Sequence, residues 1–415
     1  MDPRADRSQK FRIAVRAFGP FEKAVEREWA SFRERFSCGL ELDLVAMDHH
    51  PLYDELFVRQ GLRRGDWDVA FLNTDWIAVA HRTGAVVDLS TRIRNCPPEG
   101  YPAGWAPSLL RIQQFGDMIL GLPYHDGPEC FIYRRDLFED PAEQAEFLRQ
   151  NGCPLAIPET WDDFLRVARF FTRPDRGLFG TIFGAYPDGH NTVYDICLQL
   201  WTRGGELFDA GGRMRLDTPE MIDALEFYRA ALNDASAVHP ACRECDSVKS
   251  GMAFARGEVA MMVNWFGFAA MCETIAESKV AGRVDVTTIP HGPGGATVSL
   301  NAYWVLSVAS GSPHPDVGYQ FIRHAMSRAL DKERALDGVI GCRKSTWTDP
   351  EVNRKVPFYR CMQSLHAHAR ELPCLANFAE LSAVIDRMAL DAINTSEPTP
   401  AIVCRAQEAA DRLGS

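Results

Sequence analysis

The sequence has 415 residues and a formal net charge of −11, with 46% hydrophobic and 24% charged residues. A chain of this length can form two or three domains that each bury a core. Its apolar runs are shorter than the roughly 18 residues that a membrane span needs, and its scattered Lys and Arg residues argue against a nucleic-acid-binding surface.

Strand and helix patterns alternate from the start of the chain, which is typical of an α/β protein. Apolar segments predict strands at 11–17, 40–46 and 69–72. Between them, apolar residues at helical spacing predict helices at 21–36 and 53–62.

The polar lead in front of the first strand, MDPRADRSQ, has none of the basic, apolar and small-residue regions of a secretory leader. It predicts a cytoplasmic protein, a protein whose leader has been removed, or a start that lies upstream of this one.

The segment after the third strand contains the clearest candidate for a ligand contact. Residues 73–76 open a helix, for which Asp75 or Thr74 is the expected cap and Gly84 the expected stop. Loops at the carboxyl ends of strands hold ligands in α/β sheets. Asp75 beside Trp76 combines a hydrogen-bond acceptor with a flat apolar surface, which suits a polyhydroxylated ligand. The alternative is that Asp75 caps the helix and Trp76 belongs to the core.

A turn-rich break at 124–128 predicts a crossing between two lobes, and a new strand is expected at 130–133. The helices expected after it begin at residues 161, 194 and 218, the first of them capped by Thr160. Residues 254–263 predict a helix end, a turn and a buried strand.

The last part of the chain is expected to return to the first lobe before it ends on the second. Strands at 285–289 and 301–308 are interpreted as the return. The mostly helical remainder after residue 330 is then expected to pack on the second lobe.

Several motifs recur in a fixed order along nearly the whole chain. In addition to 61–90, they are Gly121-Leu122-Pro123-Tyr124 with 132–138, and the segments 158–164, 204–208, 254–261 and 372–385. In order and spacing they resemble the family 1 extracellular solute-binding proteins of ABC importers, the group that includes maltose- and other sugar-binding proteins.

The resemblance implies an α/β, two-lobed periplasmic-binding-protein type II fold with the ligand cleft between the lobes. The expected lobes are 1–127 with 268–328, and 128–267 with 329–415. Hinge closure around a small polar ligand, most readily a carbohydrate, then creates the shape that a permease recognises. The resemblance also implies a periplasmic, monomeric protein whose partners are the transmembrane subunits of an ABC permease, with no cofactor, no metal and no catalytic role.

The residues that the resemblance places at the ligand are Asp75, Trp76, Tyr124, Asp126, Tyr194, Asn264, Trp265, Asn301, Tyr303 and Trp304. Asp75 matches the family's ligand-facing acid, and Tyr194 matches its aromatic stacking position. The loop at 16–19 and Ser382 depart from the maltose-type pattern. The ligand is therefore predicted not to be maltose.

Other functional classes are alternatives to a sugar-binding protein. The sequence has no G-x-S-x-G, P-loop or H-E-x-x-H motif that would predict an enzyme. The same fold can hold a polyamine, for which Asp75 and Asp126 supply two acids, or another small cation or metal complex. A cytoplasmic ligand sensor is a further alternative.

The twelve cysteines include one cluster with metal-like spacing, His239-x-x-Cys242-x-x-Cys245. A structural zinc site needs a second pair of ligands, and none follows at suitable spacing. Free thiols are therefore favoured over a local disulfide or a zinc site.

Overall fold

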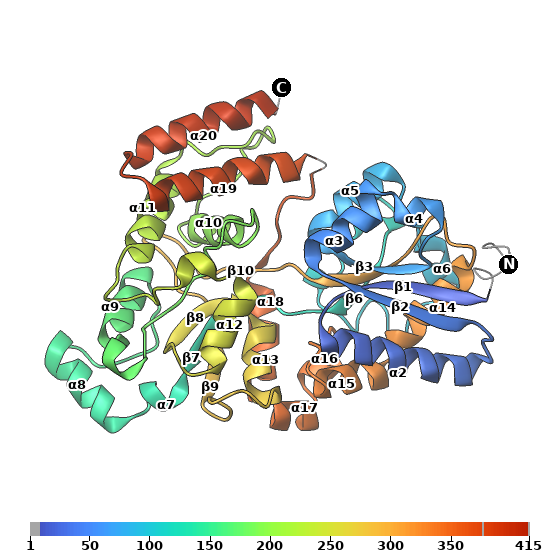
Figure 1. Cartoon of the computed structure of the whole chain (residues 1–415), viewed down its shortest axis with the longest axis horizontal. Coiled ribbons are helices and arrows are strands. Elements are labelled where there is room, and N and C mark those ends of the chain that lie inside the picture. The colour runs from blue at the N-terminus through green and yellow to red at the C-terminus, as the bar shows by residue number, and fades with distance from the viewer. Residues whose placement is uncertain (1–8, 376, 414–415) are drawn as a thin grey trace. The chain divides into compact units, whose positions relative to one another are not determined.

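The computed structural model describes residues 9–375 and 377–413, which form two compact units (Figure 1). Unit 1 contains the described residues up to Gly127, together with Asn301–Gln363 and a short segment that begins at Glu371. Unit 2 contains Pro128–Leu300, Ser364–Arg370 and the described residues from Asn377 onward.

Unit 1 is built on a five-stranded sheet with the order β2-β1-β3-β11-β6. The strands are β1 (Lys10–Arg16), β2 (Glu41–Met47), β3 (Val69–Asn73), β6 (Leu122–His125) and β11 (Trp304–Val308). β1 is parallel to β2 and β3, whereas β11 is antiparallel to both β3 and β6. The other four strands therefore run in one direction, and their carboxyl ends lie along one edge of the sheet.

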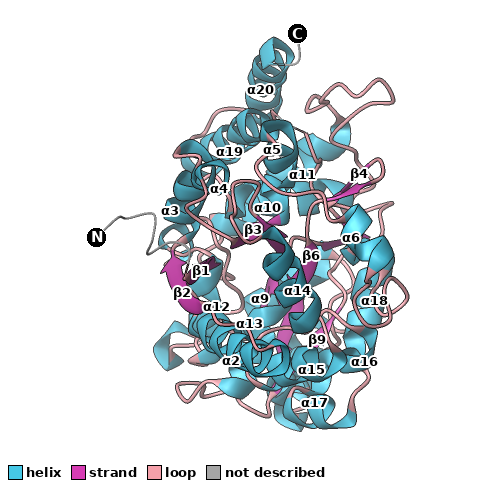
Figure 2. Ribbon diagram, turned by 90° about the vertical axis from the view of Figure 1, so that its right-hand side faces the viewer, coloured by secondary structure: helices cyan, strands magenta, loops and turns pink. Residues whose placement is uncertain are grey.

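The core of unit 1 lies where α2 (Gly19–Phe36) covers this sheet. The expected apolar stripe of α2, which includes Phe21, Trp29 and Phe32, is buried, and Phe11 of β1 stacks on Trp29 with ring centroids 4.5 Å apart. Figure 2 shows α14 and α15 beside α2.

The other elements of unit 1 are short. They are α3 (His49–Tyr53), α4 (Gly61–Arg64), α5 (Ile77–Thr83), α6 (Ser90–Asn95), α14 (Pro315–Ala325), α15 (Arg328–Leu336), α16 (Lys344–Trp347), α17 (Pro350–Lys355) and the hairpin of β4 (Gln114–Phe115) and β5 (Met118–Ile119). Gly84 ends α5 in the left-handed conformation, as the sequence predicts.

The helix expected at 53–62 begins earlier and is irregular. α3 starts at His49 and continues into a π-helical turn at Asp54–Val58. Pro51 lies near the start of α3, where its missing N–H costs no helical hydrogen bond.

Unit 2 contains a three-stranded antiparallel sheet with the order β8-β7-β9 and a separate strand pair, β10 and β12. The strands are β7 (Glu129–Arg134), β8 (Met261–Trp265), β9 (Val284–Thr287), β10 (Ser299–Leu300) and β12 (Ala369–Arg370).

Helices make up most of the rest of unit 2. They are α7 (Arg135–Phe138), α8 (Pro141–Asn151), α9 (Trp161–Phe171), α10 (Asn191–Trp201), α11 (Pro219–Leu232), α12 (Ser247–Ala255), α13 (Phe266–Thr274), α19 (Phe378–Asn394) and α20 (Thr399–Leu413). Thr160 caps α9 through its side chain, as predicted, and Thr218 caps α11 in the same way. α18 (Met362–Ala367) contains the point at which the chain passes from unit 1 to unit 2.

The chain returns to unit 1 later than the sequence pattern suggests. Residues 268–300, expected in the first lobe, belong to unit 2 because β9 pairs with β7 along four residues. Residues 329–363, expected in the second lobe, belong to unit 1, where α15 packs against α2.

Among the described residues, every helix is too short or too polar to cross a membrane.

Candidate ligand-binding site

The carboxyl edge of the unit 1 sheet brings together several residues that the sequence analysis places at the ligand. Trp304, the first residue of β11, pairs with Asn73 at the end of β3 and with His125 at the end of β6. The residues that follow these two strand ends, Asp75 and Asp126, therefore belong to the same edge as Trp304.

The loop that carries Asp75 is held by its neighbours. Asn73 Oδ1 accepts a hydrogen bond from the Asp75 backbone N–H at 3.0 Å, and Asn73 is thus the cap of the short 3₁₀ turn Thr74–Trp76. Thr74 accepts from the Tyr303 backbone N–H through its hydroxyl at 3.1 Å. The expectation that Asp75 or Thr74 caps the helix is wrong, because α5 begins only at Ile77 and has no side-chain cap, while Asn73 caps the turn before it.

Two tryptophans form an aromatic corner at this edge. The rings of Trp76 and Trp304 meet edge to face, with centroids 5.6 Å apart and an interplanar angle of 88°. Trp76 is 6% exposed and also contacts His49, whereas Trp304 is only half-buried. Trp76 therefore packs as a buried neighbour of Trp304, and Trp304 is the ring whose exposed surface a ligand could contact.

Asn301 has the most informative side chain of unit 1. It is 1% exposed, and neither its Nδ2 donor nor its Oδ1 acceptor has a hydrogen-bond partner among the described residues. A buried polar group without a partner costs about 1–3 kcal/mol, and such groups are rare in folded proteins. The Asn301 amide is therefore a candidate for a ligand contact.

The two tyrosines expected at the ligand are core residues of unit 1. Both are fully buried; the Tyr124 hydroxyl donates to Glu28 at 3.1 Å and the Tyr303 hydroxyl donates to Gln113 at 2.6 Å. These hydrogen bonds hold the two tyrosine side chains in the core of unit 1.

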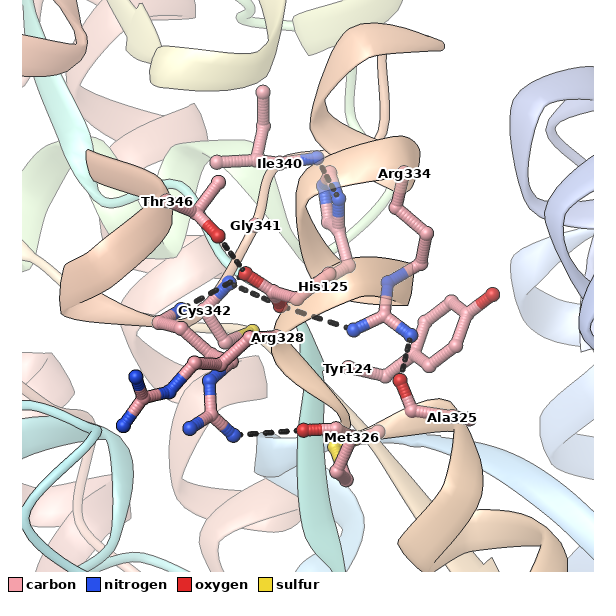
Figure 3. A network of polar contacts seen from close by, with 12 residues as sticks. Tyr124, His125, Ala325, Met326, Arg328, Arg334, Ile340, Gly341, Cys342 and Thr346 are labelled. Carbon is pink, nitrogen blue, oxygen red and sulfur yellow. Dashed lines mark hydrogen bonds and ion pairs between the residues drawn. The ribbon is translucent and has the colours of Figure 1, made fainter. Parts of the chain in front are cut away.

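A buried polar network fixes the end of β6, as Figure 3 shows. The Arg334 guanidinium lies 4.2 Å from the Tyr124 ring centroid and donates to Asp331 at 3.0 Å. The Ile340 backbone N–H donates to His125 Nδ1 at 3.0 Å. Burial, assisted by the Arg334 charge, lowers the pKa of His125 to about 3, so this ring stays neutral and keeps accepting.

The same network holds the loop that follows residue 340. The backbone N–H groups of Cys342 and Arg343 donate to the Asp331 carboxylate at 3.0 and 3.2 Å, and the Asp126 backbone N–H donates to Ile340 at 3.1 Å. Local sequence patterns contained no signal for the link between β6 and this loop, because His125 and Ile340 are 215 residues apart along the chain.

Unit 2 gathers the other three expected residues. The Tyr194 and Trp265 rings meet edge to face at 5.3 Å, and the Tyr194 hydroxyl is 2.7 Å from His190 Nε2. Asn264 donates to the Ser247 carbonyl at 3.0 Å and accepts from the Trp265 backbone N–H at 2.8 Å. Its amide thus serves to orient the half-buried Trp265.

The cluster of His239, Cys242 and Cys245 makes hydrogen bonds to the backbone of unit 2. All twelve cysteines are free thiols in the structure. Cys242 accepts from the Phe183 backbone N–H at 3.4 Å, and burial raises the pKa of its thiol to about 12. His239 accepts from the Ala241 backbone N–H at 3.2 Å. In the described part of the chain, no group of His, Cys, Asp and Glu residues has an arrangement that could hold a metal ion.

Comparisons with known proteins identify relatives of this chain. Residues 52–330 match the family model described as "Bacterial extracellular solute-binding protein". A probable ABC transporter-binding protein of Deinococcus radiodurans is 23% identical over 332 residues, which cover 79% of this chain and 74% of that protein.

Solved structures share the fold over nearly the full length. An ABC transporter solute-binding protein of Agrobacterium radiobacter K84 in complex with ribitol has a TM-score of 0.83 at 22% identity, covering 97% of this chain and 98% of its own. Maltose-bound MalE3 of T. maritima also has a TM-score of 0.83, at 21% identity, with 97% and 99% covered. The fold is thus the α/β, two-lobed fold of sugar-binding proteins. Because the family model matches well over half of the sequence, this chain belongs to the bacterial extracellular solute-binding proteins.

Proposed function

We propose that this protein is the solute-binding component of an ABC importer and that it captures a neutral, polyhydroxylated ligand, a sugar or a polyol. Support comes from its family and from the ligands of similar structures, which are ribitol, maltose and α-D-tagatose in three of them. Binding of this kind makes or breaks no covalent bond.

The observation that carries the ligand class is the buried amide of Asn301, which has no hydrogen-bond partner among the described residues. An amide offers two N–H donors and a carbonyl acceptor. A hydroxyl group can donate and accept, so a ligand with several hydroxyls satisfies both ends of the amide at once. A polyamine has only donors when charged and leaves the Asn301 donor without a partner.

The residues around Asn301 complete the proposed contacts in unit 1. Trp304, three residues after Asn301 in the sequence, offers a half-buried ring on which the CH face of a sugar can lie. We propose that the half-buried Asp75 carboxylate accepts hydrogen bonds from ligand hydroxyls. Tyr194 and Trp265 are the proposed aromatic contacts from unit 2.

The partners and the location follow from the same proposal. The protein delivers its ligand to the transmembrane subunits of an ABC permease, works as a monomer and is periplasmic, in keeping with the extracellular family to which it belongs.

A ligand screen tests the proposal. A ligand that binds only the folded state raises its stability by about 2.7 kcal/mol when present at 100 times its Kd. We expect the melting temperature to rise with at least one of ribitol, D-mannitol, maltose and α-D-tagatose, and calorimetry to give a single-site isotherm for it. A rise with spermidine and none with the four neutral compounds would establish the polyamine alternative instead.

A further inference from the structure

Unit 2 contains two buried polar side chains, Glu129 and Ser299, that have polar atoms without partners among the described residues, and neither was identified from the sequence. Glu129, the first residue of β7, is 6% exposed, and its Oε2 has no hydrogen-bond partner among the described residues. Ser299 of β10 is 0% exposed, and its Oγ is likewise without a partner in the described part of the chain.

The register of the sheet places Glu129 beside the aromatic pair of unit 2. Glu129 lies directly opposite Trp265 in the antiparallel pairing of β7 with β8. Residues directly opposite in such a pair project from the same face of the sheet. Trp265 in turn packs on Tyr194 of α10 at 5.3 Å. The Glu129 side chain therefore lies beside Trp265 of the Tyr194–Trp265 pair.

Ser299 reaches the same part of unit 2 from a different element. β10 packs against both β7 and α10, the elements that carry Glu129 and Tyr194. Glu129 and Ser299 are 170 residues apart in the sequence. Each has one buried polar atom without a partner among the described residues, and both residues belong to the region where β7, β10 and α10 pack together. Each such atom costs free energy unless a bound molecule completes its hydrogen bonds.

We propose that Glu129 and Ser299 form a hydroxyl-binding subsite of unit 2, beside Tyr194 and Trp265, for a neutral polyhydroxylated ligand. The subsite rests on the proposed function and adds to it two ligand contacts from unit 2. A hydroxyl group is the matching ligand because it can donate to the free Glu129 oxygen and accept from the Ser299 hydroxyl.

The electrostatic surroundings of Glu129 favour a neutral ligand over a cation. Burial, together with the nearby Asp195 charge, raises the pKa of Glu129 well above its usual range. Burial also raises the pKa of Asp195 to about 7, against the opposing effect of the hydrogen bond from Tyr228. The protonated form of Glu129 is thus favoured in these surroundings, and that form takes part in hydrogen bonds without a charge.

Substitutions at the two residues, with a matched control, test the subsite. We would measure Kd by calorimetry for the tightest of the four neutral probes named above, and the melting temperature without ligand. Ser299→Ala should weaken binding about three- to tenfold and leave the melting temperature unchanged or higher, because it removes an unpartnered hydroxyl. Ser307→Ala is the control: this buried serine donates to the Leu120 carbonyl at 2.7 Å. It should bind like the parent and melt about 2–4 °C lower.

Two variants of Glu129 test whether its carboxyl group binds the ligand in the neutral, protonated form. Glu129→Gln keeps the shape and a neutral hydrogen-bonding group, and it should bind within about threefold of the parent. Glu129→Leu removes the group and should weaken binding at least about tenfold. If Glu129→Leu does not fold, Ser299→Ala and Glu129→Gln still decide the outcome.

The possible results separate this proposal from the proposed function. Parent-like binding by Ser299→Ala and Glu129→Leu, while Asn301→Ala loses affinity, overturns the subsite alone. A loss in Glu129→Gln as large as in Glu129→Leu overturns the neutral form and indicates an ionised carboxylate. A parent that binds none of the four probes overturns the proposed ligand class and the subsite with it.

Discussion

The Arg334 guanidinium donates to the Glu28 carboxylate at 2.9 Å, and neither side chain is exposed to solvent. The pair links α15 to α2 across 306 residues of sequence, and it explains why α15 belongs to unit 1. A buried ion pair is costly to break, since the remaining charge has no compensation.

Arg334→Met should therefore lower the free energy of unfolding of unit 1 by about 3–5 kcal/mol, measured by urea denaturation. The double variant Glu28→Gln/Arg334→Met should lose less than Arg334→Met alone, because it removes both charges of the pair. Arg328→Met, which breaks an exposed ion pair with Glu99, should cost no more than about 1 kcal/mol. Losses that simply add in the double variant would contradict a direct coupling of the two residues.

Asp75 and Asn73 should respond to substitution in opposite ways. Asp75→Ala should weaken ligand binding at least about tenfold and leave the fold intact, because a hydrogen bond to a charged acceptor contributes about 1.5–3 kcal/mol and Asp75 is not the cap. Asn73→Ala should cost about 1 kcal/mol of stability through loss of the cap. Calorimetry and melting temperature together check both. Unchanged affinity in a folded Asp75→Ala variant would remove Asp75 from the ligand contacts.

Substitutions of the two tryptophans of the aromatic corner in unit 1 should also have different effects. Trp304→Leu should weaken binding by about 1–3 kcal/mol, because it removes the ring surface offered to a sugar. Trp76→Leu should chiefly lower the melting temperature, since this ring is buried among its neighbours. The opposite assignment, with binding lost only in Trp76→Leu, would place Trp76 rather than Trp304 against the ligand.

Asp195 should make the stability of unit 2 depend on pH. Burial raises its pKa in the folded state from 3.8 to about 7, so the folded state holds a proton that the unfolded chain has released. The stability that this proton contributes is complete below pH 4 and is lost as the pH rises to about 7 and beyond. The loss is on the order of a few kcal/mol.

The urea midpoint of the parent is accordingly expected to fall between pH 5 and pH 8. Asp195→Asn should flatten this slope, because the amide does not titrate. Glu226→Gln, an exposed position on α11, should keep the slope of the parent. An Asp195→Asn variant with the full slope would assign the pH dependence to other groups.

Much of the local structure could be predicted from the sequence because it depends on neighbouring residues. Thr160 and Gly84 act as helix cap and stop as expected, since each needs only the backbone of its own helix end. The apolar stripe of α2 that includes Phe21 and Trp29 could be predicted from its helical spacing, and it is buried. The family could be recognised for the same reason, because its motifs are short and ordered along the chain.

The tertiary structure decided what depends on distant partners. The sequence pattern predicted a strand at 285–289 but not that it would pair with β7 in unit 2, because strand pairing involves residues that the local pattern does not contain. Tyr124 lies at the predicted crossing and Asn301 at the start of the predicted returning strand. Only the fold shows that the Tyr124 hydroxyl is hydrogen-bonded to Glu28, while the Asn301 amide has no partner among the described residues. Whether a polar side chain is available for a ligand depends on which partners the rest of the chain brings to it, and a hydrogen-bond partner 96 residues away, as Glu28 is from Tyr124, leaves no trace in local periodicity.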